Sequence, residues 1–410
     1  MRNRNAESLL QKEVVVVVRQ SKWMIALFAV WVASAHAVDT IQTGALINMM
    51  ESEDPIVGFR SIDTIFPVKT IERPEKPFRF KEVPEDLNGT PYEWHSTKST
   101  LEAFLEKTKT TALLVVKDDA IAFEHYALGN DKASNATSMS VAKSFTSALI
   151  GIAVEEGLIK SIDDPVDQYV PALKDSGYAG VSIKHILQMS SGIGFSEIYD
   201  DDTSDVMVMM GQVSLGKSIA DYAAGLKPDY EPGTKFNYAS IDTNVLGMLI
   251  ESVTGKNPAQ YLEEEIWKKI GMEYDATWAT DNHGNVLAFA WLNVTARDFA
   301  KFGRLYLNEG RWDGEQIVHA AWVKESLVPG ADYLKLTDHY VPGWDIGYQY
   351  QWWVPAGNDG EFTAIGVWGQ YIYVNRAQNL IIVKSSVDPD FDSRDMETIA
   401  VFRAIGQALE

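Results

Sequence analysis

The sequence predicts an α/β fold of the α+β type, in which one sheet takes strands from both ends of the chain. Strand-like stretches lie near both ends, at 111–117 and 120–127, and again at 348–354, 367–375 and 380–385. The middle, about 161–328, consists mostly of helical segments joined by glycine and proline turns. This order is typical of a sheet completed by the two chain ends around a helical insertion.

The N-terminus has the pattern of a secretory signal peptide. An apolar run at 24–33 follows the basic residues Arg19 and Lys22, and it ends in the small-x-small triplet at 35–37. We therefore expect 1–37 to be a signal peptide, the protein to be exported to the periplasm or secreted, and no stable membrane insertion after cleavage. An uncleaved N-terminal anchor is the alternative, although the run is short for a membrane span.

The remainder divides into an arm and one domain. Residues 38–90 contain five prolines that interrupt any long periodicity, which predicts an extended arm lying on the domain. Residues 91–410 are then a single large domain, with a polar loop at 129–137. Its predicted helices lie at 99–107, 141–156, 183–189, 244–253 and 296–307.

Composition excludes several classes of function. The formal net charge of −21 argues against nucleic acid as a partner, because a phosphate backbone needs a basic surface. The absence of cysteine excludes disulfides, a cysteine nucleophile and any thiolate metal site. The seven histidines form no pair with metal-ligand spacing, so we expect no metal and no other cofactor.

The strongest chemical signal is S-x-x-K, formed by Ser140 and Lys143 at the start of a predicted helix. Three residues span nearly one helical turn, so both side chains lie on one face. A serine hydroxyl becomes a good nucleophile when a nearby base accepts its proton, and a lysine serves as that base when burial lowers its pKa. The helix N-terminus also directs backbone N–H groups at a developing oxyanion.

The surrounding segments resemble those of the serine β-lactamase/penicillin-binding-protein superfamily, in particular class C β-lactamases and related esterases and peptidases. The matching stretches begin at the S-x-x-K helix and continue with IKHILQMSSGI at 183–193, PGTKFNYAS at 232–240 and TARDFAKFG at 295–303. Together they cover about 95–385 in the expected order. The resemblance implies a β-lactamase-like fold with an antiparallel sheet and an acyl-enzyme mechanism.

Carried over residue by residue, the resemblance makes Ser140 the acylated nucleophile. Lys143 and Tyr238 become its proton-handling partners, and which of the two is the general base stays open. Ser240 occupies the position where the second motif more usually has asparagine, and it keeps a hydrogen-bonding group there.

The third motif departs from the superfamily pattern. The expected K-T-G or H-T-G is replaced by VWGQ at 367–370, in which Gly369 would allow close backbone approach and Trp368 would contact the substrate. The N–H groups of Gln370 and Ser140 would form the oxyanion hole. The missing cation normally meets the carboxylate of a β-lactam or a D-Ala-D-Ala peptide, so its loss favours esters or amides without that anion.

This third motif, together with Y-x-S as the second, resembles the branch of 6-aminohexanoate-dimer hydrolases and esterases. In that branch a tyrosine and an aspartate from one loop reach the substrate, which would be Tyr199 and Asp205 here. A solvated loop is the alternative for both. The leading hypothesis is a serine hydrolase of small esters or linear amides. A β-lactamase or D,D-peptidase, and a catalytically weak binding protein, are the alternatives.

Overall fold

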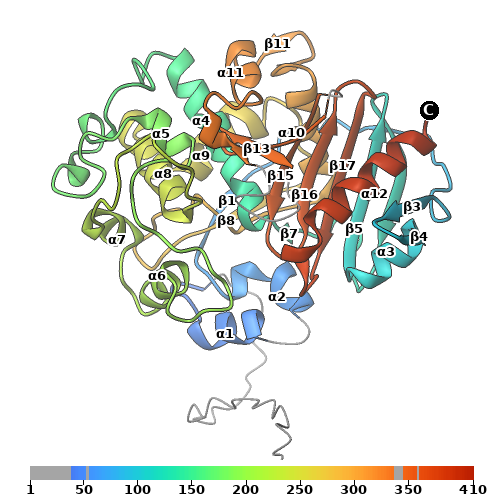
Figure 1. Ribbon diagram of the computed structural model, residues 1–410, viewed down its shortest axis with the longest axis horizontal. Helices are drawn as coiled ribbons and strands as arrows, with labels where there is room; N and C mark the ends of the chain where they lie inside the picture. Colours follow the sequence, from blue (N-terminus) through green and yellow to red (C-terminus); the bar gives the residue numbers. More distant parts are fainter. Residues whose placement is uncertain (1–37, 52–54, 337–344, 358–359) are drawn as a thin grey trace, which may run out of the picture. The chain divides into compact units, whose positions relative to one another are not determined.

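The computed structural model describes residues 38–410, except 52–54, 337–344 and 358–359 (Figure 1). The chain separates into two units, Met1–His36 and Ala37–Glu410, and only the second is described here. The predicted signal peptide, 1–37, lies outside the described residues. No helix within the described part is both long and apolar enough to cross a membrane.

A nine-stranded sheet forms one side of this unit, and it confirms the predicted sheet built from both chain ends (Figure 1). In spatial order its strands are β12 (Lys335–Leu336), β13 (Ile346–Gln349), β14 (Trp352–Pro355), β15 (Glu361–Gly366), β16 (Gln370–Asn375), β17 (Leu380–Ser386), β5 (Thr110–Lys117), β6 (Ala120–Tyr126) and β2 (Lys81–Glu82). Strand β17 near the C-terminus pairs directly with β5. Every pair is antiparallel except β2 with β6.

Two of the predicted strands are interrupted. The stretch 367–375 begins instead with a turn after β15, and β16 starts only at Gln370. Trp368 and Gly369 adopt positive φ values of 65° and 82°, which end a strand. The stretch 348–354 is likewise divided between β13 and β14 by positive φ at Tyr350 and Gln351.

Side-chain alternation gives the sheet two apolar faces. On β16, Tyr371 and Tyr373 face helix α12 (Asp395–Ala408), where they make ring contacts with Phe402. Helix α3 (Leu101–Lys107) shares that face. The alternate residues Ile372 and Val374 face α10 (Ala296–Leu307) on the other side. The sheet is therefore covered on both faces by helices.

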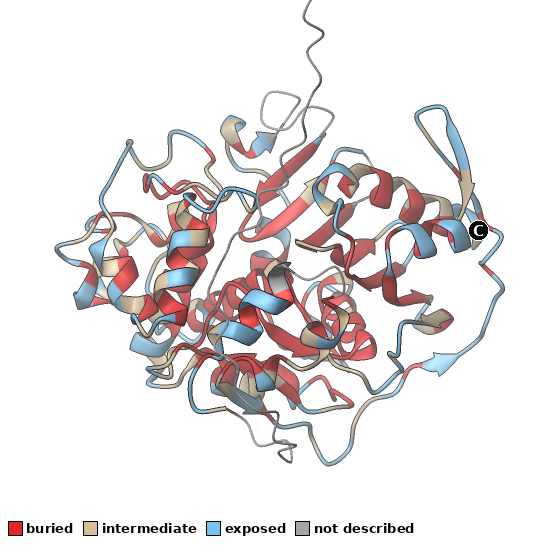
Figure 2. Cartoon of the chain, turned by 90° about the horizontal axis from the view of Figure 1, so that it is seen from below, coloured by how far each residue is buried: buried red, intermediate tan, exposed pale blue. Residues whose placement is uncertain are grey.

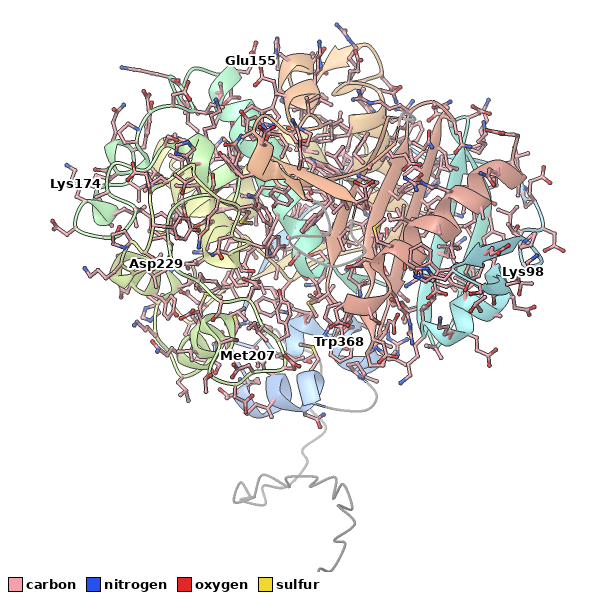
Figure 3. All side chains as sticks on the ribbon, viewed as in Figure 1. Lys98, Glu155, Lys174, Met207, Asp229 and Trp368 are labelled. Carbon is pink, nitrogen blue, oxygen red and sulfur yellow. The ribbon has the colours of Figure 1, made fainter. Side chains whose placement is uncertain are left out.

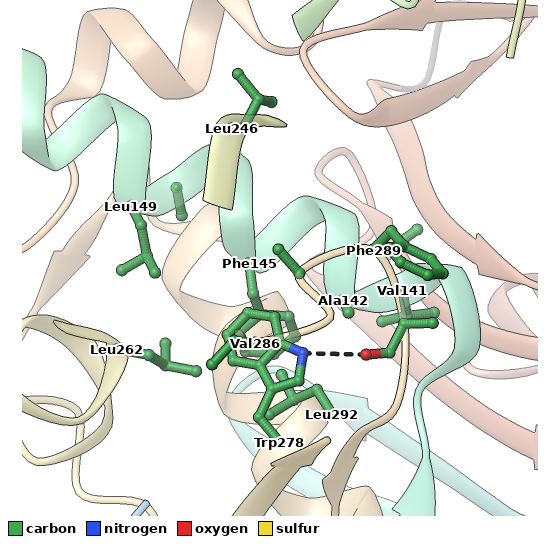
Figure 4. Packing of buried hydrophobic residues seen from close by; sticks show 14 of the residues in the cluster. Val141, Ala142, Phe145, Leu149, Leu246, Leu262, Trp278, Val286, Phe289 and Leu292 are labelled. Atoms are coloured by element: carbon green, nitrogen blue, oxygen red, sulfur yellow. Dashed lines mark hydrogen bonds between the residues drawn. The ribbon is translucent and has the colours of Figure 1, made fainter. Parts of the chain in front are cut away.

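The helical side is built around α4 (Ala142–Glu155), which packs against α8 (Ser240–Thr254). The other helices of this side are α5 (Ile183–Leu187), α6 (Asp205–Ser214), α7 (Ile219–Gly225), α9 (Pro258–Leu262) and its continuation Glu263–Trp267. Phe145 stacks on Phe302, with ring centroids 3.7 Å apart, and so joins α4 to the sheet-covering α10. Figure 4 labels Phe145 and Trp278 in the resulting core and draws a hydrogen bond from the Trp278 indole. The indole N–H lies 3.1 Å from the Leu287 carbonyl and 3.0 Å from the Ala290 carbonyl.

The predicted extended arm, 38–90, contains two helices, α1 (Thr43–Glu51) and α2 (Ile56–Arg60). Strand β1 (Val68–Ile71) then pairs with β8 (Ala276–Ala279) in a second sheet. That sheet has the order β1-β8-β9-β7, with β9 at Leu292–Val294 and β7 at Ala136–Thr137. Helix α1 forms because 43–51 contains no proline and has apolar residues along one side. The prediction of an extended arm, which was based on the prolines, therefore underestimated the regular structure of this segment.

Smaller elements complete the unit. They are the hairpins β3 (Pro91–Trp94) with β4 (Thr97–Thr100) and β10 (Arg311–Trp312) with β11 (Glu315–Gln316), and the helix α11 (Ala320–Glu325). Buried residues run continuously through both the sheet side and the helical side, whereas exposed residues gather on the outer turns (Figure 2). The larger of two buried clusters, which contains residues of α4, α8, α10 and one face of the nine-stranded sheet, therefore supports the region where the two sides meet.

Candidate active site

Ser140 lies in a single 3₁₀ turn, Met139–Val141, that leads directly into α4. Met139 has a φ of 43°, a strained value for a side chain of its size. The turn is fixed by Ser138, whose Oγ accepts from Leu292 N at 3.0 Å and donates to the Met139 carbonyl. The serine is thus presented at the N-terminus of a buried helix by a sharp, well-supported turn.

Lys143 follows one helical turn later, and its Nζ lies 2.8 Å from Ser140 Oγ. The side chain is only 2% exposed. Burial lowers the pKa of Lys143 to about 8, while the charge of Glu197 acts in the opposite direction. A lysine with this pKa has an appreciable neutral fraction near neutral pH, and only the neutral amine can accept a proton.

Two further groups surround the Lys143 amine. Ser240 Oγ, at the N-terminus of α8, and the carbonyl oxygen of Phe289 each lie 3.1 Å from Nζ. Ser240 in turn donates its hydroxyl proton to Glu197 Oε1 at 2.5 Å. The predicted residue Ser240 therefore contacts the lysine and links it to a carboxylate.

Tyr238 lies beside this pair. The Lys143 amine is 5.0 Å from the centroid of the Tyr238 ring. The ring is held by Trp353, which stacks on it at 5.7 Å and 25°, and by Tyr348, which meets it edge-on at 6.1 Å. The structure therefore brings together the three residues of the predicted Ser-Lys-Tyr set.

The loop before α6 contributes Tyr199. Its hydroxyl donates to Glu197 Oε1 at 2.7 Å. Burial, followed by the charge of Glu197, raises the pKa of Tyr199 well above its usual value, so it remains a neutral phenol. Because Glu197 also accepts from Ser240, Tyr199 is connected through this carboxylate to the residues around Lys143.

Asp205 has a different place. It begins α6, and its Oδ2 accepts from both the N–H and the Oγ of Ser196, each at 2.8 Å. The Asp205 N–H returns a bond to Ser196 Oγ, also at 2.8 Å. These contacts close the base of the loop that carries Tyr199, so the carboxylate supports the loop and does not join the Ser140 cluster.

The structure places a different glycine of the third motif against the nucleophile. A Cβ on Gly366, the last residue of β15, would lie 2.6 Å from Ser138 O and 3.1 Å from Ser140 N. A Cβ on Gly369 would instead meet Ser386 Oγ at 2.3 Å, behind the turn. The close approach expected of Gly369 therefore belongs to Gly366, because 367–369 form a turn and the strand predicted to begin at 367 begins only at Gln370.

Gln370 and Trp368 also occupy other places than a continuous strand would give them. Gln370 pairs with Gly366 across the β15–β16 hairpin, and its side-chain amide donates to Ser386 O at 2.6 Å. Trp368 projects from the turn and meets Phe59 of α2 and Phe391, with centroid distances of 5.8 and 6.2 Å. Figure 3 labels Trp368 beside the N-terminal helices, on the same edge of the unit as Met207 of α6.

Buried polar groups hold the turn from behind. Ser386 Oγ lies 2.7 Å from the Trp368 carbonyl and 2.8 Å from that of Gly369, and it accepts from Lys384 Nζ at 2.8 Å. Lys384 is 1% exposed, and burial lowers its pKa to about 7. The sequence motif does not predict this support, because Lys384 and Ser386 lie outside it, on β17.

The comparisons with known proteins identify the family of this fold. A family model described as Beta-lactamase matches residues 97–404. The chain belongs to the β-lactamase family.

Relatives in the β-lactamase family include two curated proteins. The 6-aminohexanoate-dimer hydrolase of Paenarthrobacter ureafaciens is 31% identical over 302 residues, which cover 72% of this chain and 76% of that protein. A β-lactamase of Pseudomonas fluorescens is 23% identical over 248 residues, which cover 59% of this chain and 62% of that protein. The chain is accordingly an enzyme, a serine hydrolase of the β-lactamase family.

Solved structures show the same fold. A Bacillus anthracis protein assigned as a 6-aminohexanoate-dimer hydrolase matches with a TM-score of 0.80 and 24% identity, over 91% of this chain and 97% of that one. A family VIII carboxylesterase matches with a TM-score of 0.56 and 16% identity, over 74% of this chain and 94% of that one. The β-lactamase-like fold predicted from the sequence is confirmed.

Three groups of this β-lactamase-family site were not predicted as functional. Glu197 stands two residues before Tyr199, in a segment that was recognised only for its tyrosine. Gly366 lies just before the VWGQ segment at 367–370, in which the prediction assigned the close approach to Gly369. Phe289 acts through its backbone carbonyl, which leaves no signal in the side-chain sequence.

Proposed function

We propose that the chain hydrolyses small esters or linear amides through an acyl-enzyme on Ser140. The observation that carries this proposal is the buried Lys143 amine, 2.8 Å from Ser140 Oγ. Ser140 Oγ attacks the substrate carbonyl carbon, and its proton passes to Lys143 or Tyr238. The same groups return the proton to the departing alcohol or amine as its bond to the carbonyl carbon breaks. Water then attacks the carbonyl carbon of the acyl-enzyme, the bond from that carbon to Ser140 Oγ breaks to release the acid, and one proton of the water restores the Ser140 hydroxyl.

We assign the oxyanion hole to the backbone N–H groups of Ser140 and Val367. This assignment replaces Gln370, because Gly366 is the glycine that lies against the nucleophile and Val367 is the residue that follows it. Two N–H groups from separate elements are the usual arrangement for a tetrahedral intermediate. The Ser138-supported turn and the Ser386-supported turn would then hold one donor each.

Gly366→Ala tests this assignment. The added methyl would lie 2.6 Å from the backbone oxygen of Ser138. Because a backbone atom cannot rotate away as a side chain can, we expect the end of β15 to move away from Ser140. We expect kcat to fall roughly 100- to 1,000-fold, the usual cost of losing one oxyanion donor, with little change in KM. Gly211→Ala is the matched control, since a Cβ there has no neighbour within 4 Å. Normal kcat in a folded Gly366→Ala enzyme would contradict the assignment.

The surroundings of the site favour an uncharged acyl or leaving group. With Gly366 as the glycine of the third motif, the position at which K-T-G carries its cation is occupied by buried Ala364, and the strand end continues into Val367 and Trp368. Tyr199, Phe391 and Trp368 form a half-buried aromatic row, with centroid distances of 6.4 and 6.2 Å. An apolar surface of this kind suits an aliphatic chain, and the 6-aminohexanoate-dimer hydrolase relative supports a linear amide as one substrate.

A substrate panel tests the function. The protein lacking 1–37 would be assayed with p-nitrophenyl butyrate, the linear 6-aminohexanoate dimer and nitrocefin, each followed to initial rate. We expect turnover of the ester or the amide, with nitrocefin slower by at least about 100-fold in kcat/KM, as the loss of a charge-assisted contact implies. Preferential nitrocefin turnover would establish the β-lactamase alternative. No turnover, together with no labelling of Ser140 by a fluorophosphonate, would leave a binding role.

A further inference from the structure

Glu197 is a charged side chain inside the cluster for which the acyl-transfer scheme has so far no use. Its carboxylate receives three donors. Oε2 accepts the N–H of Ser240 at 2.8 Å, and Oε1 accepts the Ser240 hydroxyl at 2.5 Å and the Tyr199 hydroxyl at 2.7 Å. Through these three bonds the Glu197 carboxylate joins the N-terminus of α8 to the loop that carries Tyr199.

These bonds determine which way the Lys143 amine can point its electron pair. The Phe289 carbonyl, 3.1 Å from Nζ, is an acceptor only. The Ser240 hydroxyl donates its one hydrogen bond to Glu197. Its oxygen, 3.1 Å from Lys143 Nζ, can therefore only accept from the amine. A neutral lysine has two N–H groups and one electron pair. With both N–H groups engaged by Phe289 and Ser240, the pair is left for the third neighbour, Ser140 Oγ at 2.8 Å.

We propose that Glu197 is a positioning residue of the serine–lysine pair, acting through Ser240 to keep the electron pair of Lys143 directed at Ser140. The inference rests on the proposed acyl-enzyme function, to which it adds the residue that sets the direction of proton transfer. Without an acceptor at Glu197, the Ser240 hydroxyl could donate to Nζ instead, and the electron pair would turn away from Ser140.

Glu197 also carries charge into a site with several titratable groups. Its charge acts on Lys143 of α4, on Tyr199 of its own loop and on Asp242 in the first turn of α8. Burial is the largest cause that raises the pKa of Asp242 to about 7, and Glu197 adds to it. Glu197 raises the pKa of Lys143 against the effect of burial. Removing its charge should therefore make both neighbours more acidic.

Glu197→Gln is the first test. An amide presents an N–H where either the Ser240 N–H or its hydroxyl needs an acceptor, so it cannot reproduce all three bonds. We expect kcat/KM for p-nitrophenyl butyrate to fall roughly 10- to 100-fold, mainly in kcat, because the reacting groups remain but are misdirected. The acid limb of the kcat/KM profile should move down by about one pH unit, since the lost charge favoured protonated Lys143. Glu197→Asp should restore the limb and part of kcat.

A double-mutant cycle tests whether Glu197 acts through Ser240. Ser240→Ala removes the intermediary, so adding Glu197→Gln should lower kcat by less than about threefold further, against the full loss in the wild-type background. Glu397→Gln on α12 is the control, because this buried carboxylate accepts from Tyr92 at 2.8 Å and from Lys107 at 2.9 Å on the opposite face of the nine-stranded sheet. It should leave the acid limb in place.

The outcomes separate this inference from the proposed function. An active wild type with multiplicative effects of the two substitutions, or with an unmoved acid limb in Glu197→Gln, overturns the inference alone. If the wild type turns over no substrate, the rate of Ser140 labelling by a fluorophosphonate replaces kcat/KM in the same cycle. A wild type that is neither active nor labelled overturns both. Far-ultraviolet circular dichroism establishes that each variant is folded. If Glu197→Gln does not fold, the kcat of Ser240→Ala still measures the effect of breaking the link between Glu197 and Lys143.

Discussion

Replacing Ser140 by alanine is expected to abolish hydrolysis of p-nitrophenyl butyrate, with a fall in kcat of about 10⁴- to 10⁶-fold, as for removal of a nucleophile elsewhere. Alanine at the first residue past a strained Met139 keeps the turn, but no oxygen remains to attack the substrate carbonyl. The measurement is the steady-state rate together with intact mass after a fluorophosphonate, which should add one adduct to the wild type and none to the variant.

The matched control is Ser144→Ala, one turn further along α4. Ser144 is buried, and its Oγ donates to the Gln351 carbonyl at 2.7 Å rather than to Ser140 or to the Lys143 amine. Its loss should cost stability of about 1–3 kcal/mol, measured by thermal unfolding, and leave kcat within a few-fold. Equal ester turnover by wild type and Ser140→Ala would mean that another serine is the nucleophile.

Replacing Lys143 by methionine carries the second largest expected effect. Methionine fills a similar buried volume but can neither accept the Ser140 proton nor bond to Ser240, so we expect kcat/KM to fall about 10³- to 10⁴-fold. The rate at which a fluorophosphonate labels Ser140 should fall in parallel, because formation of the acyl-enzyme and of the phosphonyl adduct need the same activated hydroxyl. Both rates are measurable on one preparation.

Lys143→Arg and the pH profile define the role of the amine. Arginine retains the positive charge but does not release a proton, so it should be nearly as inactive as methionine. With Lys143 as the general base, the active form of the enzyme is the one with the neutral amine. Since the pKa of Lys143 is lowered to about 8, kcat/KM should rise as the pH increases through that value and be lost below it. More than a tenth of wild-type activity in Lys143→Arg would assign the base to Tyr238 alone.

The parts of the molecule that could be predicted from sequence are those in which the spacing or the polarity of the side chains determines the local structure. Ser140 and Lys143 were predicted to meet because helical spacing alone places them one turn apart, and their contact is 2.8 Å. The strands β5 and β17 have continuous apolar runs because both faces of the sheet are covered, and they were placed correctly to within two residues. Tyr238 needed the motif, since no spacing relates it to α4.

The parts that could not be predicted depend on backbone conformation or on distant partners. The turn after β15 arises from positive φ at Trp368, an uncommon value for tryptophan that its neighbours do not announce. The choice between Gly366 and Gly369 then depends on where that turn falls. Glu197 becomes part of the site only because the loop before α6 folds back onto Ser240, 43 residues later in the chain.

The long-range pairing of β5 with β17 has a consequence for how the enzyme comes into being. Partners in this pair, such as Val115 and Ile382, lie at opposite ends of the hydrolase domain, and β16 and β15 attach beyond β17. A ribosome delivers the serine and its lysine long before it delivers the strand that ends at Gly366. During synthesis the nucleophile is therefore complete before the sheet beside it has formed, and the chain becomes able to hydrolyse a substrate only after its C-terminal strands have been made.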